Sequence, residues 1–156
     1  MSATVTLPEG FHYLAPAFVL TIFLLYGQNI TVSRYRKRAG IAYPQMYAEK
    51  KQAEDSNDAH LFNCAQRAHQ NTLENIPIMY TAALVAGLKY PVFAAASLAF
   101  WSLSRVSYTL GYITGDPNKR GTILFKAGIV VSLGVIGLAT FVSGAWLCEG
   151  LAAKFF

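Results

Sequence analysis

The stretch RAHQNTLENIP, residues 67–77, places charged and amide side chains between two apolar parts of the chain. Arg67, Asn71 and Glu74 are spaced i, i+4 and i+7, so on a helix they lie within about 60° of one another and form one polar stripe. An ionisable side chain in hydrocarbon costs at least about 2.5–3.5 kcal/mol. A membrane helix carrying this stripe must therefore turn it toward protein, water or a ligand.

The composition around this stretch is typical of a membrane protein. Of the 156 residues, 54% are apolar and 13% are charged, whereas soluble domains average about 25% charged residues. Apolar segments near the ~20 residues needed to cross a bilayer predict helices over about 11–33, 60–89, 92–114 and 122–148. We expect a single all-α domain over 1–156, an integral membrane four-helix bundle with left-handed packing.

The placement of positive charge predicts the topology. Lys and Arg cluster in the segment between the first two predicted helices and again at Lys119–Arg120, whereas the turn between the second and third helices has only Lys89. Positive charge favours the cytosolic side, so both basic loops are expected in the cytosol. Because these charges flank membrane spans, we do not expect a nucleic-acid partner.

A second polar stripe is predicted on the third helix. Arg105, Tyr108 and Tyr112 are spaced i, i+3 and i+7, so they share a face, and both stripes fall in the cytosolic half of the bilayer. One interpretation is structural, with Arg67 and Glu74 pairing only to hold the helices together. The surplus of cationic, hydroxyl and amide groups instead favours a small anionic ligand.

The chemistry of the stripes limits that ligand. A carboxylate suits an arginine, an ammonium group suits Glu74, and amide groups suit Asn71 and the tyrosines. Glutathione has all of these groups, although a phospholipid headgroup or a nucleotide could use the same arginines. No spacing of His and Cys predicts a metal site.

The two stripes also carry a resemblance to a known family. FNCAQRAHQNTLENIP (62–77) and SRVSYTLGYITGDPNKR (104–120) resemble the membrane-associated proteins in eicosanoid and glutathione metabolism (MAPEG), and the likeness extends over about 30–146. The resemblance implies a homotrimer in the endoplasmic reticulum membrane that binds glutathione between subunits near the cytosolic surface. It further implies conjugation of glutathione to lipophilic electrophiles, reduction of lipid hydroperoxides, or leukotriene synthesis.

The resemblance assigns roles to individual residues. The predicted glutathione-binding residues are Arg67, Asn71, Glu74, Tyr108 and Tyr112, with Arg36 supplied by the adjacent subunit, and the stripe on the third helix adds Arg105. The catalytic cation is predicted at Arg120 on chemical grounds, although strict spacing from Tyr112 gives Lys119. His69 replaces a glutamine of some relatives and lies opposite the stripe, which favours a subunit contact.

The predicted chemistry is activation of the glutathione thiol. A guanidinium beside the sulfur, that of Arg120, would stabilise the thiolate, which is the reactive nucleophile. The lipophilic substrate would arrive from the membrane lipids along the apolar surface between helices. Two alternatives stay open from the sequence: a non-catalytic lipid- or glutathione-binding scaffold, and a structural subunit of a larger membrane complex.

Overall fold

The computed structural model describes residues 6–155, and every regular element in that range is helical. The elements follow in the order η1 (Phe11–Tyr13), α1 (Leu14–Ala39), α2 (Lys50–Asp55), α3 (Asn57–Gly87), α4 (Pro91–Tyr112), η2 (Pro117–Arg120) and α5 (Ile123–Phe155). The all-helical fold predicted from the sequence is therefore confirmed. Its left-handed bundle packing stays a prediction.

The helix ends differ from the predicted ones, for reasons that lie in single residues. The first helix continues to Ala39, where Gly40 ends it with a left-handed φ of 65°, a conformation that suits glycine. The second begins at Asn57 because the hydroxyl of Ser56 accepts a hydrogen bond from the Ala59 amide at 3.4 Å. The last continues to Phe155, beyond its expected end near 148.

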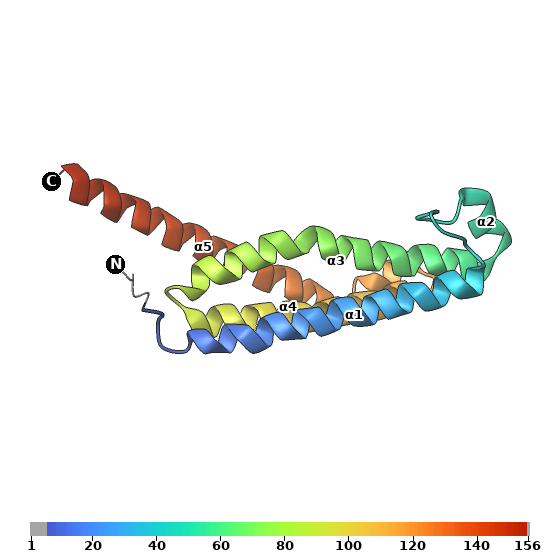
Figure 1. Cartoon of the computed structure of the whole chain (residues 1–156), viewed down its shortest axis with the longest axis horizontal. Coiled ribbons are helices and arrows are strands. Elements are labelled where there is room, and N and C mark those ends of the chain that lie inside the picture. Colours follow the sequence, from blue (N-terminus) through green and yellow to red (C-terminus); the bar gives the residue numbers. More distant parts are fainter. Residues whose placement is uncertain (1–5, 156) are drawn as a thin grey trace.

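The long helices lie side by side along the molecule. Figure 1 shows α1 and α4 running in one direction, with α3 and α5 running in the other. The segment Phe11–Ala39 and α5 are each long and apolar enough to cross a membrane. The C-terminal half of α5 extends past the other helices (Figure 1), and its residues 146–155 are exposed.

Small residues bring the helices into close contact in the half of the molecule remote from α2. Ala83 and Ala86 of α3 and Ala94 of α4 are completely buried, and small side chains let membrane helices approach closely. In the other half the contacts become polar. The buried Gln28 of α1 donates to Thr72 of α3 at 2.9 Å and to Thr109 of α4 at 2.8 Å. This polar layer lies beside the candidate site.

Candidate functional site

The polar stripe of α3 forms one hydrogen-bonded group. Arg67 Nη1 donates to Glu74 Oε1 at 3.1 Å, and Asn71 Nδ2 donates to Glu74 Oε2 at 3.4 Å. The shared face predicted from the spacing is therefore confirmed. The side chains of Arg67 and Glu74 are 45% and 46% exposed, so this ion pair lies at the surface of the single chain and does not close off a core.

Arg105 of α4 joins this group from the inside. Its Nη2 donates to Asn71 Oδ1 at 2.7 Å, and its Nε and Nη2 each lie 3.1 Å from Thr72 Oγ1. The residue is only 4% exposed. In the structure its donors hold Asn71 and Thr72, so α4 fixes the position of the amide on α3. Direct binding of the ligand by Arg105 stays a prediction.

The two tyrosines of α4 continue the same face. The rings of Tyr108 and Tyr112 pack edge to face with centroids 5.1 Å apart, and the guanidinium carbon of Arg105 lies 4.2 Å from the centroid of Tyr108. Both tyrosines are buried and pack with Cys64 and Ala68 of α3. The predicted common face of Arg105, Tyr108 and Tyr112 is confirmed.

The turn after α4 brings a cation back onto these tyrosines. Arg120 Nη1 donates to the hydroxyl of Tyr112 at 2.9 Å. The turn can fold this closely because Gly111 has no side chain: a Cβ there would collide with the carbonyl oxygen of Lys119 and lie 2.9 Å from the Cα of Arg120. Of the two cations that the sequence left open, Arg120 is therefore the one that joins the cluster by a side-chain hydrogen bond.

Arg36 does not join the cluster of its own chain. Its Nη1 donates to the backbone carbonyl of Gln45 at 2.6 Å, and its guanidinium stacks on the rings of Tyr43 and Phe62. The residue is 8% exposed. Within one chain its role is to hold the segment after α1; a contact with glutathione in a neighbouring subunit stays a prediction.

The structure adds Tyr47, which the sequence analysis did not identify. Its hydroxyl donates to Gln70 Oε1, beside Arg67. Burial raises the pKa of Tyr47, and the nearby charge of Arg67 acts in the opposite direction. Asn63 fixes the segment by pairing with both backbone groups of Ala48, at 2.8 and 2.9 Å. No helical or strand periodicity in 40–49 indicated this position.

His69 faces the interior of its own chain. Its Nδ1 lies 3.3 Å from Gln28 Oε1 of α1 and the residue is partly buried; the expected subunit contact stays a prediction. The described residues 6–155 contain no group of three or more metal-ligating side chains close enough to hold an ion.

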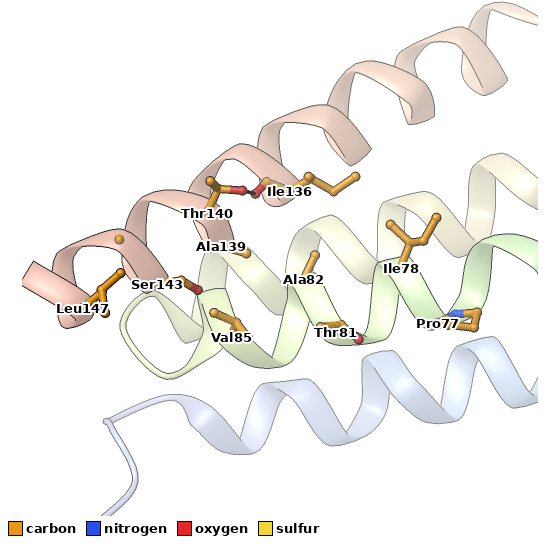
Figure 2. Close-up of a pocket in the computed structure, with 11 residues that line it drawn as sticks. Pro77, Ile78, Thr81, Ala82, Val85, Ile136, Ala139, Thr140, Ser143 and Leu147 are labelled. Atoms are coloured by element: carbon orange, nitrogen blue, oxygen red, sulfur yellow. Dashed lines mark hydrogen bonds between the residues drawn. The ribbon is translucent and has the colours of Figure 1, made fainter.

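Two neighbouring cavities lie next to this cluster. A cavity of about 370 Å³ lies among α3, α4 and α5, with Asn71 and Arg105 in its wall. It shares Ile78 and Ile136 with a larger groove of about 790 Å³ between α3 and α5. Figure 2 shows this groove, which is lined mostly by apolar side chains from both helices as far as Leu147, with Thr81, Thr140 and Ser143 among them. A mostly apolar groove thus adjoins the cavity at the polar cluster.

Apolar helices that carry a cluster of charged and phenolic groups define a class, a helical membrane protein with a partly exposed polar site. The comparison with known families gives the same class: the model of the MAPEG family matches residues 13–141. The chain therefore belongs to the MAPEG family. These are glutathione-related membrane proteins of the transferase and synthase type, whose members use glutathione as substrate or cofactor.

Proposed function

We propose that this protein is a membrane-bound glutathione transferase that also reduces lipid hydroperoxides, similar to the type-three microsomal glutathione transferases. The proposal includes assembly as a homotrimer in the endoplasmic reticulum membrane, with the basic loops in the cytosol. The observation that carries it is the nearness of a cluster of arginine, tyrosine, amide and carboxylate groups to a mostly apolar groove. Such a site accepts a charged peptide at one end and a lipid-soluble molecule at the other.

The donor set fits glutathione. Arg67 can bind a carboxylate and Glu74 an ammonium group, while the amide of Asn71 can bond the peptide links. The half-exposed Arg67–Glu74 pair is accessible to such a ligand. Because exposed charges do not face lipid, this surface has to be covered in the membrane, and a neighbouring subunit that contributes Arg36 satisfies that requirement.

Glutathione supplies the thiol that becomes the nucleophile. A free thiol has a pKa of about 8.5, so Arg120 must favour the thiolate for the reaction to run at neutral pH. One charge-assisted contact can lower a pKa by about one to two units, at about 1.4 kcal/mol per unit. Tyr112 holds the Arg120 guanidinium in place, and Arg105 holds Asn71. The thiol proton leaves to cytosolic water.

The groove between α3 and α5 supplies the second substrate. Ile78, Val85 and Leu147 line it, and at Ile78 and Ile136 it adjoins the smaller cavity, whose wall contains Asn71 and Arg105. A lipophilic electrophile or a lipid hydroperoxide can enter such a groove from the bilayer without crossing water. The polar cluster then excludes the lipid from the peptide end of the site.

Titration of glutathione into the purified protein, followed by ultraviolet absorbance of the thiolate, tests this proposal. We expect a thiolate signal in the wild type, near-complete loss in Arg120→Ala, and retention in Lys119→Ala, the matched control one residue earlier. Calorimetry on the same samples reports whether glutathione still binds. A signal lost in Lys119→Ala and kept in Arg120→Ala would transfer the catalytic role to Lys119.

The same titration separates the two alternatives. Binding without thiolate in the wild type would indicate a scaffold that binds glutathione without activating it. The intramolecular bonds of Arg67 and Arg105 favour a purely structural cluster as the second candidate, and for that candidate no glutathione binding is expected.

A further inference from the structure

A second groove, separate from the glutathione cluster, lies between the parallel helices α1 and α4. Its outer part has a volume of about 700 Å³ and is lined by Thr31, Arg34, Tyr35, Lys37, Arg38 and Ile113. Its inner part, about 230 Å³, continues along the helices past Gly27 and Leu110. The two parts share Thr31 and Ile113, so they form one groove with a basic end and an apolar end.

The inner part is open toward the lipid side. Phe23 is 68% exposed and Leu110 is 58% exposed, although both lie on helices that pack together. At Gly27 a Cβ would meet no atom within 4 Å, which leaves room against the α1 backbone. An unbranched hydrocarbon chain fits a narrow apolar groove of this kind better than a compact polar molecule does.

The outer part carries positive charge that the protein neutralises only in part. Arg34, Lys37 and Arg38 lie at i, i+3 and i+4 on the last turns of α1, on one side of the helix. Arg38 pairs with Asp58 at 2.7 Å. Within residues 6–155, Arg34 and Lys37 form no salt bridge with any acid. The mouth of the groove therefore attracts an anion.

We propose that the α1–α4 groove binds an anionic phospholipid, with its phosphate among Arg34, Lys37 and Arg38 and one acyl chain along Gly27. Basic pockets between membrane helices on the cytosolic side recognise such headgroups, and α1 ends in these cations at the side that positive charge assigns to the cytosol. Glutathione and nucleotides lack the chain that the inner groove accepts, and neutral lipids lack the charge. The groove shares no lining residue with the Arg67–Glu74 stripe, so this site is independent of the proposed glutathione chemistry.

Native mass spectrometry of the detergent-solubilised protein tests the site, with phosphatidic acid and phosphatidylcholine of equal chain length as probes. The wild type should bind phosphatidic acid in preference to phosphatidylcholine. The double variant Arg34→Gln/Lys37→Gln should lose on the order of 30-fold in affinity for the anionic lipid, and its affinity for phosphatidylcholine should not change. Gly27→Leu keeps the charges but fills the inner groove, so it should weaken binding of both lipids.

The matched charge control is Lys50→Gln/Lys51→Gln, which removes two exposed cations of α2 outside the groove and should bind phosphatidic acid as the wild type does. An equal loss of affinity for phosphatidic acid in this control would mean that the lipid is attracted only by the protein's overall positive charge, and it would overturn the proposal. Equal binding of the two lipids by the wild type would overturn it as well. Glycerol phosphate, which has no acyl chain, should not displace the lipid; displacement by it or by glutathione would also count against the groove.

Discussion

Arg67, Arg105 and Arg120 differ in what their guanidinium groups contact, and this difference separates their roles. Arg67 is half-exposed beside Glu74, Arg105 is buried against Asn71 and Thr72, and Arg120 bonds a phenol at the end of α4. An exposed ion pair can exchange one partner for another at little cost in free energy. A buried guanidinium that loses its partners is left as an unpaired charge, which costs much more. Arg67 and Arg120 therefore lie where a ligand can reach them, whereas Arg105 holds Asn71 from the inside.

Replacing Glu74 by glutamine tests the predicted contact with the ammonium group of glutathione. The substitution keeps the size and the hydrogen-bonding oxygen but removes the charge, so glutathione affinity should fall roughly two- to fivefold, as for a partly exposed ion pair. Calorimetric titration measures the change. A glutathione analogue without its amino group should bind the wild type and Glu74→Gln with equal affinity.

Glu54→Gln is the control for this experiment, because Glu54 pairs with Lys50 at 3.8 Å on α2, away from the site. Its affinity for glutathione should equal that of the wild type. Unchanged affinity in Glu74→Gln would remove Glu74 from the binding site and leave its bond to Arg67 as its only role.

Among the helices, one hydroxyl joins three of them. Thr72 Oγ1 of α3 accepts hydrogen bonds from Gln28 of α1 and from Arg105 of α4, and it donates to Ala68 of its own helix. No buried side-chain nitrogen or oxygen within the described residues lacks a partner. Thr72 is therefore the residue through which α1 and α4 are both hydrogen-bonded to α3 in this layer.

Thr72→Val should destabilise the protein by about 1–2 kcal/mol, because Gln28 and Arg105 each lose one buried acceptor and keep only Thr109 and Asn71. Thermal unfolding in detergent should show a lower Tm than in the wild type. Thr140→Val is the matched control: the Thr140 hydroxyl is exposed and bonds only a carbonyl of its own helix, so the Tm should hardly change. Equal Tm values for all three proteins would show that the layer contributes nothing to stability.

For the whole molecule, the exposed charges on α3 predict assembly. The proposed homotrimer would cover the Arg67–Glu74 pair and bring Arg36 of one copy to the site of the next. Arg36→Ala and Arg120→Ala should each abolish glutathione transfer. Mixed assemblies of these two variants should regain part of it, because some sites then combine an intact Arg36 with an intact Arg120.

Mixed assemblies of Glu74→Ala and Arg120→Ala are the control, since both residues belong to one chain's cluster and no mixed site is intact. Transferase assays on co-expressed variants, with the mass of the assembly checked by light scattering, give the measurement. Activity that fails to return in the first mixture would place the whole site within one chain.

The sequence by itself determined the helices, the family and the faces on which the site residues lie. Spacings such as 67–71–74 and 105–108–112 are local, and a helix converts them into a shared face whatever surrounds it. The tertiary structure decided which partners those faces meet. That Arg120 bonds Tyr112, that Arg36 is buried under its own loop, and that Tyr47 lies beside Arg67 all depend on how turns fold back against helices. Such contacts join residues far apart in the chain, and no periodicity records them.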